Sequence, residues 1–502
     1  MLHAVDGDFH ALPLQELADA ALSRAGQLGA THADVRVERI REGMLGLRDG
    51  RLLSSHDGED VGVAVRVVHD GTWGFAAGVA LTVDAVARLA DLAVDLAQVS
   101  RPVNTEPVEL ASEAVHTNET WVSAYDVDPF SVPEGDTVAL LAERSALLLR
   151  ASGVDHVDAL AQQVKEHKFY ADSAGTTTTQ QRVRVAAKLT AVHVDHDSGD
   201  FTTMRTLAPP VGRGREYLTG TGWDWETELA ELPELLAEKA AAPSVEPGDY
   251  DLVIDPTNLW LTIHESVGHA TELDRALGYE ANYAGMSFAT PDKLGSLRYG
   301  SPAMQVSGDR TTEHGLASIG FDDDGVAAQR WDLIRDGVLV GYQLDRRTAA
   351  LHGLERSNGC AFADSPGHVP LQRMANVSLQ SASGGPSTEE LIASVDRGLY
   401  VVGDKSWSID MQRYNFQFTG QRFFLIRNGR LAGQVDDAAY QSTTTEFWGS
   451  LAALGGPATY RLGGAFNCGK GQPGQVAPVS HGCPSALFRG VRILNTVQEG
   501  GR

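Results

Sequence analysis

Residues 251–269 read DLVIDPTNLWLTIHESVGH, in which a short apolar strand passes directly into a helix. Asp255 can cap that helix and Pro256 suits its first turn, so we predict a strand that ends at Asp255 and a helix that begins near Pro256. The helix carries the pattern His-Glu-x-x-x-His, which runs from His264 to His269. Two histidines and a glutamate on one helix are typical of a metal site.

The spacing of the two histidines requires a distortion of the helix if both are to bind one metal ion. In the commoner zinc motif the histidines are four positions apart and share one helix face. Here they are five positions apart, which places them roughly 140° apart on an ideal helix. A single metal ion could not readily accept both, so we expect a kink, a bulge or the helix end close to His269. Gly268 precedes it and tolerates such a distortion.

The residue types suit zinc, although spacing leaves the third ligand open. Imidazole and thiolate bind zinc well, and three protein ligands leave a position for water, whose proton Glu265 could take as general base. The candidates for the third ligand are Glu272, Asp274, His314, Cys468, His481 and Cys483. Cys468 ranks modestly above Glu272, because it lies in a glycine-rich segment in which Lys470 would favour the thiolate.

Several of these residues also have ordinary structural interpretations. The His-Glu-x-x-x-His pattern alone is weak evidence for a metal. A lone buried cysteine is usually a small hydrophobe, which is our expectation for Cys360. His481 and Cys483 are neighbours on a loop, so a structural role is expected rather than a second metal pair. The acidic run 322–324 lacks the spacing and the closing glutamate of a calcium loop, so we predict a solvated hairpin turn there.

The remainder of the chain predicts an α+β protein with two large domains. The first half shows the order helix, strands, helix, strands, which indicates a weak internal duplication. Its predicted helices span 13–28, 83–98, 136–151 and 224–241, its first strands span 33–38 and 61–68, and a later helix spans 387–395. A linker rich in Pro and Gly at 242–249 precedes a half made mainly of strands and turns.

We therefore predict an N-terminal α/β domain over residues 1–245, with strand–helix repeats, and a C-terminal β-rich domain over residues 246–502. The C-terminal domain is expected to carry the metal-binding helix. The N-terminal domain is expected to supply the substrate groove and the subunit contacts.

Composition and charge exclude several classes of partner. The chain has 42% hydrophobic residues, as globular proteins do, and 41 basic against 66 acidic residues give a net charge of −25. This argues against nucleic acid and against an anionic membrane surface. The sequence has no apolar run long enough to cross a membrane, its first eight residues do not resemble a signal peptide, and three cysteines do not make a disulfide framework. We expect a cytoplasmic protein.

The metal motif and several later segments resemble the TldD/PmbA family. Glu272 and Asp274 follow the motif as they do in that family. Further matches occur in order at residues 319–325, 336–342, 373–376, 398–400, 426–429 and 467–472. The resemblance covers most of residues 250–490, whereas the first half resembles the family only in element order. One departure is segment 403–410, where many members have a glycine-rich stretch. We expect a different substrate preference if that segment lines the groove.

The resemblance implies a zinc-dependent peptidase, in which residues 246–502 are the C-terminal metallopeptidase domain. Catalytic members of the family hold Zn²⁺ with the two motif histidines and the late cysteine, which are His264, His269 and Cys468 in this sequence. The motif glutamate, Glu265, is the implied catalytic base. The implied reaction is hydrolysis of peptide bonds in small or unfolded peptides by metal-bound water. The implied assembly is a homodimer, or a heterodimer with a paralogue that lacks the metal ligands.

Two other functions fit the same residues. In one, the chain is a non-catalytic scaffold subunit with a structural zinc of four protein ligands, for example with Glu272 as the fourth. In the other, the chain is a metal-dependent hydrolase of other small amides. The resemblance favours the peptidase, and the abundance of strands suggests how its substrate is held, since an extended peptide can add to a sheet edge.

Overall fold

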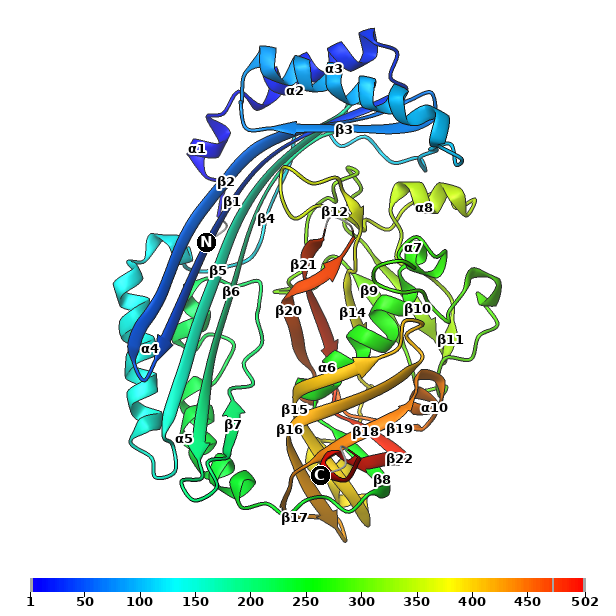
Figure 1. Cartoon of the computed structure of the whole chain (residues 1–502). Coiled ribbons are helices and arrows are strands. Elements are labelled where there is room, and N and C mark those ends of the chain that lie inside the picture. The colour runs from blue at the N-terminus through cyan, green and yellow to red at the C-terminus, as the bar shows by residue number, and fades with distance from the viewer. Residues whose placement is uncertain (1–2, 472–473, 500–502) are drawn as a thin grey trace.

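The computed structural model describes residues 3–471 and 474–499. Gln472, which ends the family-like segment 467–472, lies outside the described residues, as do Met1 and Leu2. Helices and strands are both abundant, and the predicted α+β class is confirmed. A long curved sheet forms most of the first half, and its concave side faces the second half (Figure 1).

The N-terminal sheet is built around four long antiparallel strands. Its strands are β1 (His32–Arg48), β2 (Arg51–His69), β3 (Thr72–Gly78), β4 (Glu119–Val122), β5 (His156–Asp172), β6 (Thr177–Val194) and β7 (Phe201–Arg205). The order is β3-β2-β1-β5-β6-β4, with β7 paired to β6, and β4 runs parallel to β6. Because β1 pairs with both β2 and β5, four long strands make one continuous surface.

Four long helices pack against this sheet at its two ends (Figure 1). They are α2 (Leu14–Gln27), α3 (Val83–Ser100), α4 (Glu134–Leu149) and α5 (Trp225–Ala240). Helices α2 and α3 share a hydrophobic core with β1, β2 and β3, whereas α4 and α5 share one with β5 and β6. The predicted order of helix, strands, helix, strands is confirmed, and the predicted helices differ from the observed ones only at their ends.

The second half contains a sheet that closes on itself. Its strands are β8 (Gly248–Ile254), β15 (Arg397–Ile409), β16 (Asn415–Arg427), β18 (Ala438–Thr443) and β22 (Ala486–Asn495), extended by β17 (Arg430–Val435) and β19 (Leu451–Leu454). The order is β15-β8-β22-β18-β16, and β15 also pairs with β16. Buried aromatic side chains of Phe416, Phe418, Tyr440 and Phe447 belong to the core of this half.

Smaller elements complete the second half. They are β9 (Val306–Asp309), β10 (Arg330–Arg335), β11 (Val338–Leu339), β12 (Ala361–Phe362), β13 (Leu371–Gln372), β14 (Asn376–Leu379), β20 (Arg461–Lys470) and β21 (Gln475–Cys483). The helices are α6 (Pro256–Ile263), α7 (Leu273–Ala276), α8 (Arg346–Leu351), α9 (Thr388–Ala393), α10 (Thr444–Gly449) and α11 (Thr496–Glu499), and α1 (Gly7–His10) precedes α2. Within residues 3–471 and 474–499, every helix is too short or too polar to span a bilayer.

The acidic run Asp322–Asp324 is not the solvated hairpin turn predicted from the sequence, because all three residues are buried. Lys168 on β5 donates to both carboxylate oxygens of Asp323, at 2.7 and 2.8 Å. Arg66 on β2 donates to Asp324 at 2.6 Å. The run therefore docks the second half onto the concave face of the N-terminal sheet. Buried carboxylates of this kind require such cationic partners.

Candidate metal centre

The helix distortion predicted near His269 is present inside the motif. Helix α6 ends at Ile263, residues His264–Gly268 form a π-helical turn, and His269–Thr271 form a 3₁₀ turn. The His269 N–H donates to the His264 carbonyl oxygen, five residues earlier. A π turn brings residues five apart to the same side. The two imidazole rings therefore meet, with centroids 4.6 Å apart.

Cys468 reaches the same place from β20. Its Sγ lies 3.6 Å from Nε2 of His269, and one donor atom each from His264, His269 and Cys468 lie within 4.8 Å of one another. A tetrahedral zinc ion requires roughly 3.5 Å between nitrogen and sulfur ligands, given bonds of about 2.0–2.1 and 2.3 Å. The strand register shifts between Ala465 and Cys468, and such a bulge re-aims side chains. The three donors fit a zinc ion.

The tautomer of His264 follows from its hydrogen bonds. His481 lies behind it on β21, and its Nδ1 is 2.8 Å from the Val377 carbonyl oxygen, so that nitrogen carries a proton. Nε2 of His481 therefore accepts a hydrogen bond from Nδ1 of His264, at 2.7 Å. Burial holds the pKa of His481 well below its usual range, which keeps this ring neutral. The arrangement leaves Nε2 of His264 with a free lone pair for a metal.

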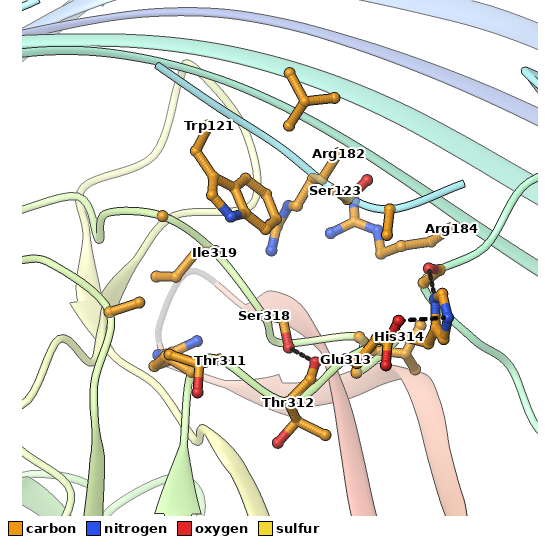
Figure 2. A pocket seen from close by; sticks show the side chains of 18 of the residues that line it. Trp121, Ser123, Arg182, Arg184, Thr311, Thr312, Glu313, His314, Ser318 and Ile319 are labelled. Atoms are coloured by element: carbon orange, nitrogen blue, oxygen red, sulfur yellow. Dashed lines mark hydrogen bonds and ion pairs between the residues drawn. The ribbon is translucent and has the colours of Figure 1, made fainter. Parts of the chain in front are cut away.

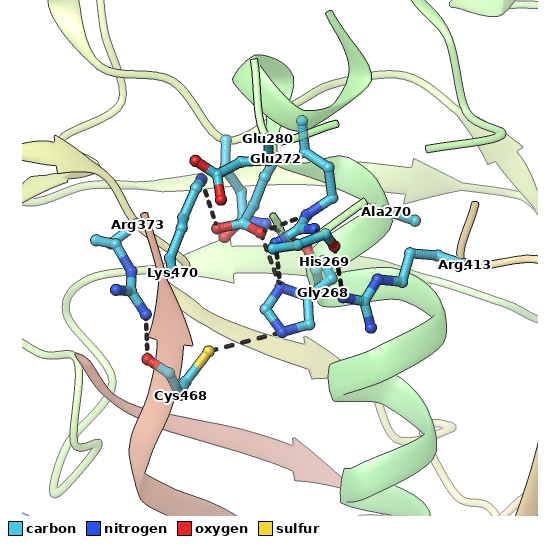
Figure 3. Close-up of polar contacts among 12 residues, drawn as sticks. Gly268, His269, Ala270, Glu272, Glu280, Arg373, Arg413, Cys468 and Lys470 are labelled. Atoms are coloured by element: carbon cyan, nitrogen blue, oxygen red, sulfur yellow. Dashed lines mark hydrogen bonds and ion pairs between the residues drawn. The ribbon is translucent and has the colours of Figure 1, made fainter. Parts of the chain in front are cut away.

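His269 is oriented in the same way by Glu272. Its Nδ1 donates to Glu272 at 2.8 Å, which leaves Nε2 facing the sulfur of Cys468 (Figure 3). Burial alone would raise the pKa of Glu272, but Lys470, His269 and Arg275 together hold it well below its usual range. Glu272 is thus an ionised partner behind a candidate ligand. A carboxylate in that position fixes the ring of the histidine and raises its basicity.

Lys470 does not act on the thiol as the sequence suggested. It donates to Glu272 at 3.1 Å and to Asp274 at 2.8 Å, because its side chain is directed away from the sulfur (Figure 3). Burial raises the pKa of Cys468, but His269 and Arg373 outweigh it, so that the pKa is lowered. Arg373 also donates to the backbone carbonyl of Cys468. The groups beside the thiol that lower its pKa are therefore the His269 ring and the Arg373 guanidinium, not Lys470.

The other two cysteines have different surroundings. Burial raises the pKa of Cys360 to about 11 and that of Cys483 well above its usual value. Both are fully buried, as expected for small hydrophobic side chains. His314, another candidate ligand, is not among the converging metal donors. Its Nδ1 lies 3.1 Å from the Gly212 carbonyl oxygen. Of the six candidates for the third ligand, Cys468 alone joins the two histidines.

Arg413 is a residue of this site that the sequence reasoning missed. Its Nη1 donates to Oε2 of Glu265 at 2.6 Å, and its Nη2 donates to the Ala284 carbonyl oxygen at 3.0 Å. Arg413 has a positive φ of 63° in a turn organised by the carboxylate of Asp410. No motif or spacing links this turn to the helix, so no sequence signal pointed to it. The contact fixes the orientation of the Glu265 carboxylate.

These side chains open into a cavity of about 890 Å³ between the two halves. One wall comes from β5, β6 and residues 205–210, and the other comes from α6, β20 and residues 404–413. Asp404, Lys405 and Trp407 belong to the wall, so the segment that departs from the family pattern does line the cavity. Among the described strands β20 pairs only with β21, so its other edge has no strand partner, and its residues 462–469 line this cavity.

Gly463 allows β20 to approach α6 closely. A Cβ at this position would lie 2.2 Å from Cγ of Trp260, whose ring stacks on His481. Gly463→Ala is expected to lower the free energy of unfolding by about 1–3 kcal/mol and to weaken metal binding. Denaturant unfolding and a metal titration measure both effects. Gly469→Ala on the same strand is the control, because its Cβ would meet nothing within 4 Å. Equal stability of the two variants would contradict this packing.

Comparisons with known proteins match both halves. The matching family models are described as PmbA/TldA metallopeptidase C-terminal domain, over residues 247–495, and PmbA/TldA metallopeptidase domain 1, over residues 33–97. A metalloprotease of Methanothermobacter thermautotrophicus is 28% identical over 478 residues, which cover 93% of this chain and 96% of that protein. A zinc metalloprotease TldD homolog of Saccharolobus solfataricus is 22% identical, with 94% and 98% covered. The crystal structure of TldE from Thermococcus kodakarensis shares the fold, with a TM-score of 0.70 at 15% identity over 94% of this chain and 98% of that one.

Proposed function

Because the chain belongs to the TldD/PmbA family of metallopeptidases, we propose that it is a zinc-dependent peptidase that hydrolyses small or unfolded peptides. The observation that carries this proposal is the convergence of His264, His269 and Cys468 beside Glu265, in one cavity. The names of the relatives support the metallopeptidase class. We also propose the zinc ion, the substrate class and the role of each residue.

The chemistry follows from the donor set and the carboxylate. Zn²⁺ held by His264, His269 and Cys468 would polarise the scissile carbonyl and lower the pKa of water. Glu265 would accept a proton from the attacking water and pass it to the leaving amine. Arg413 holds Oε2 of Glu265, whereas Oε1 accepts no hydrogen bond from the described residues. That second oxygen is therefore free to exchange the proton.

The free edge of β20 suggests how a peptide is held. Residues 462–469 line the cavity, and a strand placed beside them could pair with their backbone groups. Recognition through the backbone depends little on side chains and requires an extended substrate. The position of the cavity between two walls would exclude folded proteins. Both properties support small or unfolded peptides as substrates.

The two other functions have less support. A structural zinc needs a fourth protein ligand, and Glu272 was the candidate. Its carboxylate instead accepts hydrogen bonds from His269, Arg275 and Lys470, on the side of His269 away from the sulfur. This favours a site with an open position. A hydrolase of small amides would not need a cavity of about 890 Å³.

The remaining expectations stay predictions. We propose that residues 1–245 form a domain that supplies one wall of the groove and the subunit contacts, and that residues 246–502 form the metallopeptidase domain. We also propose a cytoplasmic homodimer, or a heterodimer with a paralogue that lacks the metal ligands.

Metal removal tests the proposed function. The protein purified with zinc available is expected to hold about one zinc ion per chain and to cleave an unstructured peptide. Chelation should abolish cleavage, and added zinc should restore it. A stably folded protein serves as the substrate control and should stay intact. Absence of bound metal would refute the proposal, and bound zinc without cleavage, alone or with a paralogue, would favour the scaffold function.

A further inference from the structure

A second cavity, of about 400 Å³, lies beside the metal cavity on the concave side of the N-terminal sheet. Figure 2 shows its lining, in which β6 and the chain near Trp121 face the loop of residues 311–319. Arg182 and Arg184 project into it from β6 (Figure 2). None of these residues takes part in the proposed hydrolysis.

Strand β6 contributes lining residues to both cavities. Alternate residues of a strand lie on one face, so Arg182, Arg184, Ala186 and Lys188 form one row along β6. The first two line the second cavity and the last two line the metal cavity. Arg184 and Ala186 are separated by roughly 6.6–6.8 Å along the strand. A peptide lying along β6 could therefore extend from one cavity into the other.

The second cavity has an excess of positive charge. Arg182 and Arg184 both pair with the single carboxylate of Glu166, at 2.9 Å each. The nearest other cation, Lys168, is 3.9 Å from Glu166 and already pairs with Glu38 and Asp323. Two guanidinium groups thus share one counter-charge. A buried charge without a partner is costly, which makes this position favourable for an anion.

Arg184 has donors that no described residue satisfies. Its Nη2 donates to Glu166 at 2.9 Å, but Nε and Nη1 find no acceptor within residues 3–471 and 474–499. The side chain is only 6% exposed. Burial and the neighbouring Arg182 lower the pKa of Arg184 to about 10, so the group stays charged at neutral pH. Unpaired buried donors on a charged group are unusual and call for a ligand.

Few groups in the second cavity would compete with an anion. The acidic residue of the lining is Glu313, which is 81% exposed and lies 3.5 Å from the ring of His314. Glu42 lies outside the lining, and its charge raises the pKa of Arg184 less than Glu166 does. Ser123 and Thr311 contribute hydroxyl groups to the lining. Guanidinium and hydroxyl groups together are typical of a carboxylate-binding site.

We infer that Arg184, with Arg182 beside it, binds a carboxylate group of the peptide substrate. The inference rests on the proposed peptidase function for the identity of the ligand. The carboxylate belongs either to the C-terminus of the peptide or to an Asp or Glu side chain, and both present the same chemistry. Such a site would select peptides by the distance between this carboxylate and the scissile bond.

Binding is tested apart from cleavage. The probes are unstructured peptides of one sequence with a free or an amidated C-terminus, and with Glu or Gln inside the sequence. They are titrated by fluorescence anisotropy into zinc-loaded protein carrying Glu265→Gln, with and without Arg184→Gln. Arg184→Gln is expected to raise the Kd of carboxylate peptides roughly tenfold or more, and to leave the Kd of fully neutral peptides unchanged. The peptides with a free and an amidated C-terminus, and those with Glu and with Gln, show which carboxylate is bound.

Three controls accompany the binding test. Arg335→Gln removes the same charge from an exposed position and should change no Kd. The melting temperature of Arg184→Gln shows whether the variant is folded, and Arg184→Lys, which keeps the charge, should recover part of the binding. A folded Arg184→Gln protein that binds both peptide classes like the parent would overturn the inference. Carboxylate-dependent binding without cleavage by wild type would instead refute the proposed function alone.

Discussion

Replacing Glu265 by glutamine is expected to reduce kcat for peptide hydrolysis by roughly 10²–10⁴-fold while bound zinc stays unchanged. Glutamine has nearly the same shape and can still accept the hydrogen bond from Arg413, but it cannot take up a proton. The carboxylate is not among the three converging donors, so metal binding should not depend on it. Steady-state kinetics with an unstructured peptide and elemental analysis of the purified protein measure the two quantities.

The control for this variant is Glu246→Gln, which makes the same chemical change at an exposed position in the chain before β8. Its kcat and zinc content should equal those of wild type. Loss of zinc together with activity in the Glu265 variant would mean that the carboxylate serves the metal rather than the proton. An undiminished kcat would remove Glu265 from the mechanism.

Replacing Cys468 by alanine is expected to weaken zinc binding by more than roughly 100-fold. Loss of a group that merely orients a ligand costs about 10–100-fold in affinity, and loss of the ligand itself should cost more. Activity at limiting zinc should fall in parallel. Competition with a chromophoric chelator measures the affinity. Cys360→Ala is the matched control, because it removes a buried thiol that has no contact with the metal donors.

Glu272→Gln provides an internal scale for the same titration, since Glu272 accepts the hydrogen bond from His269. Its affinity should lie between those of wild type and the Cys468 variant. A Cys468→Ala protein that binds zinc as tightly as wild type would exclude the thiolate as a ligand.

The sequence predicted the distortion of the motif, whereas residue chemistry alone ranked Cys468 only modestly above Glu272 as the third donor. Two histidines that are five positions apart can share a face only where the helix is altered, and the π turn lies there. No comparable geometric rule connects His269 with Cys468, because they come from a helix and a strand far apart in the chain. The choice of Cys468 therefore depended on resemblance to a family. Neither a geometric rule nor the family resemblance pointed to Arg413, so the sequence did not predict it.

The first two strands are longer than their sequence pattern predicts, for a related reason. The predicted strands 33–38 and 61–68 lie inside β1 and β2, which have 17 and 19 residues. Many residues beyond the apolar runs are charged or small, so their pattern did not indicate a sheet. The same limit explains the acidic run 322–324, whose charges looked solvated. Their burial depends on cations of another element, which composition does not reveal.

The free edge of β20 has a consequence for the targets of such an enzyme. In the proposed function, pairing along that edge requires a segment that is already extended, so a folded protein would be cut only during the fraction of time in which such a segment is open. When opening and closing are fast compared with cleavage, the rate follows the equilibrium population of the open form. A target destabilised by about 1.4 kcal/mol would be cut about ten times faster at low concentration. The lifetime of each target would then report its conformational stability more than its sequence.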